Sequence, residues 1–153
     1  MSKVNKQKFS KILVGIDGSE ESFHAADYAI ELGRQYNGEV IALNVILSDA
    51  TLFGATVPPH IMELKQEAQN YLDKVKEKIE SNTSNSDDSK LLFRTEVIGS
   101  PSAVSGIVAF AEKDNVDLII IGTRGRSGFR KLLLGSIASG VVTYSHCPVM
   151  VVK

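Results

Sequence analysis

The sequence predicts an α/β protein built on a mainly parallel sheet with helices on both faces. Short runs rich in Ile and Val alternate along the chain with longer stretches whose apolar residues recur at helical spacing. One of these runs, residues 116–121, is almost wholly apolar, which is typical of a strand that helices cover on both sides. Such an alternation favours parallel strands joined by right-handed helical crossovers.

The first three expected elements lie before residue 48. The Ile- and Val-rich run 11–16 ends at an Asp-Gly-Ser turn and predicts the first strand. Ser19 is placed to cap a helix over 20–36, because two glutamates follow it at the positive helix end. An Asn-Gly pair then ends this helix, and the β-branched run 39–47 predicts the second strand.

The middle of the chain predicts two loops around one long helix. Residues 48–59 show no periodicity and are expected to form the first loop. From His60 onward, apolar residues recur at helical spacing with charges between them, which predicts the helix. The polar segment 81–90, SNTSNSDDSK, cannot bury a face and is expected to be a mobile surface loop.

The next expected elements are a strand over 91–98, a helix, and the apolar strand 116–121. Ser100 is expected to cap that helix, with Pro101 at its first position, where the missing amide costs little. A glycine-containing loop then leads to Ser136, which is expected to be the cap of the last helix.

The last helix is expected to run to about residue 146, and residues 149–152 form the last expected strand. Five strands and four helices fit two sheet orders, 2-1-3-4-5 and 3-2-1-4-5, and spacing alone favours neither. In both orders, ligands bind at the carboxyl ends of the strands, where the direction of winding reverses.

Size and charge narrow the possible functions. With 153 residues, the chain is expected to form one domain, 1–153, with a polar leader over 1–8. The net charge of -1 argues against a nucleic-acid-binding protein. Because no apolar run is long enough to cross a bilayer, we expect a cytoplasmic protein without membrane contact.

The lone Cys147 is expected to be a small core residue rather than a reactive thiol.

A glycine-containing segment after the fourth expected strand carries the chemistry. Gly122, Gly125 and Gly135 let the backbone approach a ligand closely, so that amide N–H groups can point at phosphate oxygens. Ser136 and Ile137 add donors at the positive end of a helix. Four cations lie in the same segment: Arg124, Arg126, Arg130 and Lys131. We therefore expect an anion site with at least one cation on a phosphate; the alternative is that the glycines only turn the chain and the cations are solvated.

The spacing Gly-x2-Gly-x9-Gly-Ser resembles the nucleotide motif of ATP-binding universal stress proteins. Residues 11–19, KILVGIDGS, look like the first strand and turn of that family, and residues 147–152, CPVMVV, look like its closing strand. The similarity spans nearly the whole chain. It implies ATP as the ligand and a five-stranded parallel sheet of order 3-2-1-4-5, in which Asp17 and Gly122 end adjacent strands.

The same resemblance implies roles for individual residues. Asp17 would lie near the phosphates or their metal ion, and Val45 would contact adenine. The motif residues would hold ribose and phosphates: Gly122, Gly125, Gly135, Ser136 and Ile137. Independently of the family, a carboxylate near phosphates suits Mg²⁺, which prefers oxygen ligands. Two alternatives stay open, namely that Asp17 only shapes the turn and that Val45 only packs in the core. Asn44 stands where the family often has histidine, which bears on the adenine end.

The sequence offers a phosphate holder but no catalytic machinery. It contains no P-loop, dinucleotide fingerprint or nucleophile elbow, and its three histidines have no evident carboxylate or nucleophile partner. We expect a nucleotide-dependent stress-response or signalling module rather than a fast enzyme; the alternatives are a weak Mg²⁺-dependent ATPase and a nucleotide-free interaction protein. The apolar last strand, at 149–153, predicts a two-fold homodimer across the sheet edge, unless its own preceding loop shields that edge.

Overall fold

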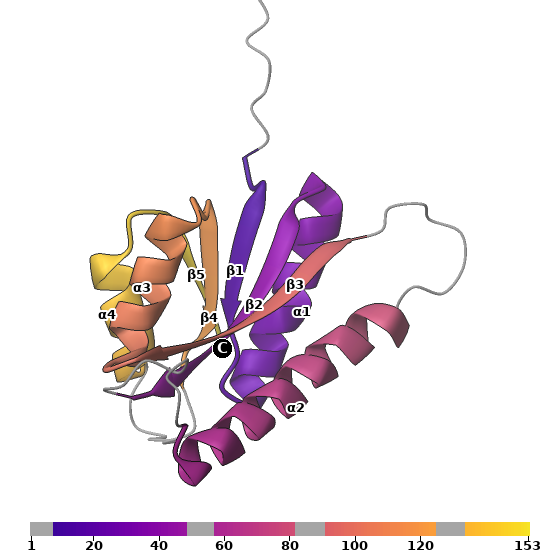
Figure 1. Ribbon diagram of the computed structural model, residues 1–153. Coiled ribbons are helices and arrows are strands. Elements are labelled where there is room, and N and C mark those ends of the chain that lie inside the picture. The colour runs from indigo at the N-terminus through magenta and orange to yellow at the C-terminus, as the bar shows by residue number, and fades with distance from the viewer. Residues whose placement is uncertain (1–7, 49–56, 82–90, 125–133) are drawn as a thin grey trace, which may run out of the picture.

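Strands and helices alternate along the chain and form three layers, with one sheet in the middle (Figure 1). The computed structural model describes residues 8–48, 57–81, 91–124 and 134–153. The strands are β1 (Lys11–Gly15), β2 (Glu39–Leu47), β3 (Leu92–Ser100), β4 (Leu118–Gly122) and β5 (Val149–Val152). The helices are α1 (Glu20–Tyr36), α2 (Pro59–Ser81), α3 (Ala103–Lys113) and α4 (Ser136–Tyr144).

The five strands are parallel and lie in the order β3-β2-β1-β4-β5. This confirms the order that the family resemblance implied. β1 and β4 lie side by side in the centre, with Ile12 opposite Leu118 and Val14 opposite Ile120. The direction of winding reverses between these two strands, so the carboxyl ends of β1, β2 and β4 meet at one edge of the sheet.

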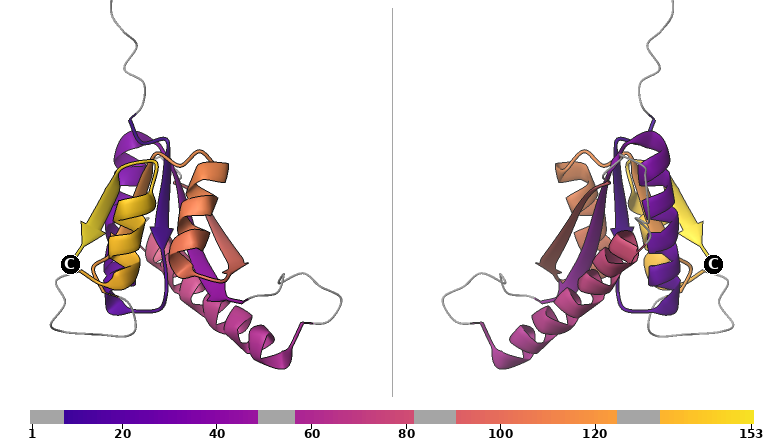
Figure 2. Two further views of the ribbon diagram at one scale, coloured as in Figure 1. Left: turned by 90° about the vertical axis from the view of Figure 1, so that its left-hand side faces the viewer. Right: turned by 90° about the vertical axis from the view of Figure 1, so that its right-hand side faces the viewer.

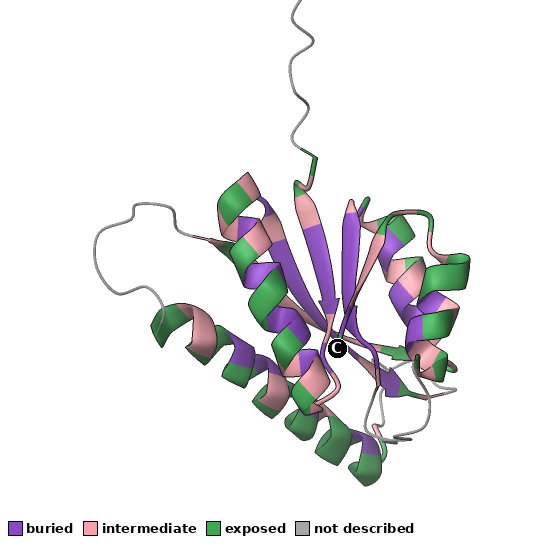
Figure 3. Ribbon diagram, turned by 180° about the vertical axis from the view of Figure 1, so that it is seen from behind, coloured by how far each residue is buried: buried purple, intermediate pink, exposed green. Residues whose placement is uncertain are grey.

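The two faces of the sheet carry separate cores. α1 and α2 cover one face, and α3 and α4 cover the other (Figure 2). Because successive strand residues point to opposite faces, Val14 packs with Ala25 and Ala29 of α1, whereas Leu13 packs with Ile107 of α3. Every residue of β4 is buried, as expected for an apolar strand covered on both sides (Figure 3).

The start of α3 differs from the sequence prediction. β3 continues through Ser100, which lies opposite Leu47 in the parallel ladder with β2. The cap of α3 is therefore Ser102, whose Oγ accepts a hydrogen bond from the amide of Ser105 at 3.1 Å. The expectation that Ser100 is the cap and Pro101 the first helical residue was wrong, because pairing with the nine-residue β2 extends the strand.

The ends of α4 also differ from the sequence prediction. The cap is Gly135, which has no side-chain hydrogen bond, and Ser136 is the first helical residue rather than the cap. The helix ends at Tyr144, before residue 146, since Ser145 is already extended ahead of the turn into β5. The expected boundaries of α1, β2 and β5 are confirmed.

Three further expectations concern the leader and the polar loop, the absence of a membrane-spanning run, and the lone cysteine. Of the expected leader 1–8 and the expected polar loop 81–90, residues 1–7 and 82–90 lie outside the described residues, and Ser81 is the last residue of α2 rather than part of a loop. None of the helices described here combines the length and the apolar composition needed to span a membrane. Cys147 is half-buried against the core on the α3 and α4 face, and burial raises the pKa of its thiol. This placement agrees with its expected role as a small core residue.

Candidate functional site

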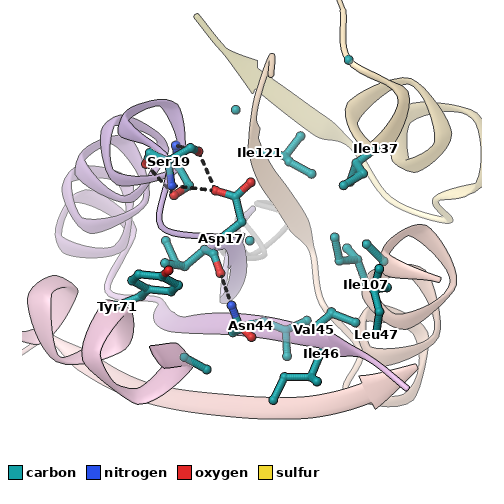
Figure 4. Close-up of a pocket in the computed structure, with 18 of the residues that line it drawn as sticks. Asp17, Ser19, Asn44, Val45, Ile46, Leu47, Tyr71, Ile107, Ile121 and Ile137 are labelled. Atoms are coloured by element: carbon teal, nitrogen blue, oxygen red, sulfur yellow. Dashed lines mark hydrogen bonds between the residues drawn. The ribbon is translucent and has the colours of Figure 1, made fainter. Parts of the chain in front are cut away.

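A cavity of about 490 Å³ lies at the carboxyl ends of β1, β2 and β4. Its walls come from these strand ends, from the N-termini of α1 and α4, and from one side each of α2 and α3 (Figure 4). The cavity is thus at the point where the winding of the sheet reverses, the usual ligand position in open parallel sheets.

Most of the predicted site residues meet in this cavity. Those that line it are Asp17, Val45, Gly122, Arg124, Gly135, Ser136 and Ile137. Gly125 lies outside the described residues, as do three of the four cations of the segment: Arg126, Arg130 and Lys131. The described lining therefore includes both ends of the glycine-containing segment, which come from the end of β4 and the start of α4.

The two ends of that segment are joined through the backbone of Thr123. Its amide donates to the carbonyl of Val152 at 2.8 Å, and its carbonyl accepts from the amide of Gly135 at 2.6 Å. A Cβ atom at position 135 would lie 2.9 Å from the Thr123 carbonyl oxygen, so this close approach requires glycine. α4 consequently begins directly beside the end of β4.

The first turn of α4 forms one wall of the cavity. The amides of Ser136 and Ile137 belong to the first helical turn and have no acceptor within the helix. No other acceptor for them occurs in the described part of the chain. Since these N–H groups also carry the positive end of the helix dipole, this wall suits an anion such as a phosphate.

Asp17 shapes the turn between β1 and α1 and also lines the cavity. Its Oδ1 accepts hydrogen bonds from the amide of Ser19 at 2.9 Å and from the Ser19 hydroxyl at 2.5 Å (Figure 4). The turn-shaping alternative is therefore correct for one carboxylate oxygen. Oδ2 takes no hydrogen bond from any described residue, and it is the oxygen that a ligand or cation could use.

The side chain of Asn44 continues the pairing of β1 with β2 beyond the last strand residue. Gly15 lies opposite Leu43, and the amide of Ile16 donates to the Leu43 carbonyl at 2.8 Å. The buried Asn44 then donates from Nδ2 to the carbonyl of Ile16 at 2.8 Å. This bond fixes the peptide just before Asp17 and so orients the turn at the cavity.

Apolar side chains form the wall on the α3 side of the cavity. Val45, Ile107, Ile121 and Ile137 lie on this side, as Figure 4 shows. Val45 also packs against α3, because a Cβ atom at Gly106 would lie 2.9 Å from its Cγ1. Core packing thus accounts for one part of the Val45 side chain, and the residue remains part of the cavity wall.

The wall contributed by α2 was not predicted as part of a site. It consists of Leu64, Glu67, Ala68 and Tyr71. The helical spacing of the apolar residues among them indicated only a core-facing side of a helix. The sequence gives no signal that the first half of this helix lines a cavity, since this depends on how α2 crosses β2 and β3.

The charged residues of the cavity are mixed in sign. Asp17 and Glu67 bring carboxylates, and Arg124 brings a guanidinium whose Nη2 lies 3.5 Å from Oε1 of Glu21. Within the described ranges, no group of three or more His, Cys, Asp or Glu residues is placed to hold a metal ion.

Comparisons with known proteins agree with this fold. The model of the "Universal stress protein family" matches residues 8–153. The chain is 37% identical over 150 residues to "Universal stress protein MJ0531" of Methanocaldococcus jannaschii, covering 95% of this chain and 82% of that protein. The solved structure of hypothetical protein MJ0577 superposes with a TM-score of 0.76 at 30% identity, covering 95% and 96% of the two chains. A universal stress protein in complex with cAMP superposes with a TM-score of 0.66 at 20% identity, covering 95% and 98%.

The matches extend over nearly the whole chain in both sequence and structure. This protein belongs to the universal stress protein family.

Proposed function

We propose that this protein binds ATP in the cavity at the ends of β1, β2 and β4, and that it acts in the cytoplasm as a nucleotide-dependent stress-response module. The observation that carries this proposal is the convergence of the α4 N-terminus and an apolar wall on one cavity. Its volume of about 490 Å³ lies within the range of roughly 300–1,000 Å³ that is usual for small-molecule sites.

The two chemically different walls suit the two ends of a nucleotide. The amides of Ser136 and Ile137, which have no acceptor among the described residues, would hold phosphate oxygens, and Gly135 allows the backbone to lie close to them. The apolar side chains at the end of β2 and on α3, Val45 and Ile107, would cover a base. Gly125 belongs to the same motif in the sequence and would add to the phosphate end.

Magnesium fits this cavity as a companion of the nucleotide rather than as a resident ion. Mg²⁺ is usually held by one or two carboxylates together with substrate phosphates and water. Asp17 would hold it through Oδ2, because Oδ1 is occupied by Ser19. When bound, the ion would offset the repulsion between the phosphates and the carboxylates of Asp17 and Glu67.

The ligand of one structural neighbour is an adenine nucleotide. That neighbour was solved in complex with cAMP, a nucleotide that contains adenine. At 20% identity that similarity supports the shared fold, and the preference for ATP rests on the cavity and on the glycine motif of this sequence.

The proposal is tested by removing one amide from the start of α4. Ser136 is the first residue of the helix, where proline is tolerated, and Gly135 before it has φ -67° and ψ 163°, which suits a residue that precedes proline. Ser136→Pro should therefore keep the helix and weaken ATP binding about tenfold, since a hydrogen bond to a charged group contributes about 1.5 kcal/mol or more. Isothermal titration calorimetry measures the change.

Ser136→Ala is the matched control, because it removes the hydroxyl and keeps the amide. If the amide holds a phosphate, the alanine variant should retain most of the affinity that the proline variant loses. Equal affinity of the wild type and Ser136→Pro for ATP would contradict the phosphate assignment. Mass spectrometry of nucleotide released from the purified protein, with parallel titrations of ATP and AMP, identifies the preferred ligand.

We also propose that the protein forms a homodimer in which β5 pairs with β5 of a second copy of the chain. β5 pairs with β4 on one side only within the described structure, and its residues are apolar. Unpaired edge strands of this kind favour pairing with another chain, and two-fold symmetry lets both copies use the same edge.

A further inference from the structure

Arg124 is the single basic residue among the described residues that line the cavity, and an acidic residue outside the cavity holds its side chain. Its Nη2 lies 3.5 Å from Oε1 of Glu21, with 35% of the arginine side chain and 27% of the glutamate side chain exposed. Glu21 is not part of the cavity wall. The guanidinium is therefore paired toward α1 instead of being free for a ligand.

Packing fixes Glu21 in this position. A Cβ atom at Gly122 would lie 2.8 Å from Cβ of Glu21, so the first turn of α1 rests directly on the end of β4. Glu21 also lies in the first turn of α1, where the positive end of the helix stabilises a carboxylate. Glu21 thus keeps a favourable environment whether or not Arg124 is paired with it.

The pair is of the weak kind that a phosphate can displace. Ion pairs between partly exposed groups usually contribute little to stability, whereas arginine binds phosphate through two parallel hydrogen bonds. The backbone of Arg124 is held in place beside Thr123 and Gly135, so an exchange of partner requires only a rotation of the side chain.

We propose that Glu21 competes with the ligand's phosphates for Arg124 and thereby lowers the preference of the cavity for phosphate-rich nucleotides. This inference rests on the proposed nucleotide binding and assigns Glu21 a role in its specificity. Glu21 would act without touching the ligand, through the position of the arginine.

The test compares two substitutions in the same helical turn. Glu21→Gln keeps the shape of the side chain and its Cβ contact with Gly122 but weakens the hold on Arg124. Glu20→Gln makes the same charge change beside it, on a residue that lines a separate surface groove with Phe23 and Lys74. ATP and adenosine are titrated into each variant at low salt, and circular dichroism verifies the fold.

Glu21→Gln should tighten ATP binding roughly twofold to fivefold, the size expected from losing a weak ion pair, with adenosine binding unchanged. Glu20→Gln should leave both affinities unchanged. In an Arg124→Gln background, Glu21→Gln should no longer tighten ATP binding, because the guanidinium for which Glu21 and the phosphates compete is absent.

Three results would overturn the role of Glu21. These are an unchanged ATP affinity in Glu21→Gln, an equal gain for adenosine, and a gain that persists in the Arg124→Gln background, which would indicate simple charge repulsion. If the wild type and Glu21→Gln both fail to bind ATP, the proposed function falls as well. If both bind ATP equally, the proposed function stands and only this inference falls.

Discussion

Gly18 is essential to the Asp-Gly-Ser turn between β1 and α1, which lines the cavity. Its φ of 86° lies in the left-handed region, and a Cβ atom there would lie 2.6 Å from the ring of Tyr71. The chain thus needs glycine for two reasons at once, the backbone conformation and the contact with α2. The Asp-Gly-Ser turn that the sequence predicts is also the place where α2 closes one side of the site.

Gly18→Ala is expected to lower the free energy of unfolding by about 1–3 kcal/mol, because it adds strain at a positive φ to a clash with an aromatic ring. Urea denaturation followed by circular dichroism measures the loss. Gly15→Ala is the control, since its new Cβ would meet its nearest neighbour, Ile107, at an ordinary 3.8 Å. Equal stability of the two variants would show that the turn tolerates a side chain.

At the scale of single elements, an ion cluster holds the amino-terminal edge of β2 and β3 to the end of α3. Arg94 of β3 contacts Glu39 of β2 and Asp114 at the end of α3, and its Nη1 lies 2.8 Å from Oε1 of Glu96. Asp114 also lies 3.7 Å from Nζ of Lys11. This cluster ties three strands and one helix together at the end of the sheet opposite to the cavity.

Arg94→Leu is expected to lower the free energy of unfolding by about 1 kcal/mol at low salt, because three carboxylates lose their shared partner. The loss should shrink in about 1 M NaCl, where the Debye length is only about 3 Å. Arg34→Leu is the control, since the contact of Arg34 with the described residues is a long hydrogen bond of 3.4 Å to the carbonyl of Ile79. A loss for Arg94→Leu that does not depend on salt would point to packing rather than charge.

The elements themselves could be predicted from periodicity and turn residues, but two helix starts could not. Ser100 and Ser102 are equally good caps by residue type, and the choice between them depends on pairing with β2 as far as Leu47. At α4, the start is set by the contact of Gly135 with Thr123, which lies twelve positions earlier in the chain. Both features come from tertiary pairing, which local sequence does not contain.

The candidate site could be predicted only on the walls that the motif supplies. The glycine spacing indicated the β4 and α4 side, and the Asp-Gly-Ser turn indicated the β1 side. The α2 wall, with Tyr71 over Gly18, arises from the path of a helix whose apolar spacing is that of any amphipathic helix. The pairing of Arg124 with Glu21 joins residues about a hundred positions apart, and only the packing of α1 on β4 brings them together.

At the scale of the whole molecule, the edge strand β5 determines how copies of the chain would meet. The amide of Ile119 donates to the carbonyl of Pro148, and the amide of Thr123 donates to that of Val152. The N–H and C=O groups of Val149 and Val151 therefore point to the open edge, because the two groups of one strand residue lie on the same side.

The proposed homodimer should give twice the chain mass of 16.6 kDa in light scattering at micromolar concentration. Val151→Pro removes a donor from the open edge and leaves the pairing with β4 in place, so it should shift the protein toward monomers without unfolding it. Val142→Ala, on the exposed side of α4, tests a helix-mediated contact instead. A monomer mass for the wild type would contradict the edge-strand dimer.

The backbone of Thr123 connects the edge strand β5 to the wall of the cavity. Its amide donates to Val152 at the end of β5, and its carbonyl accepts from Gly135, the cap of α4, so a displacement of β5 would act on the helix whose first turn lines the cavity. If copies of the chain associate through β5, dilution would then alter how tightly a nucleotide is held. Thermodynamic reciprocity requires the converse, so that a bound nucleotide would change the association constant of the chains by the same factor.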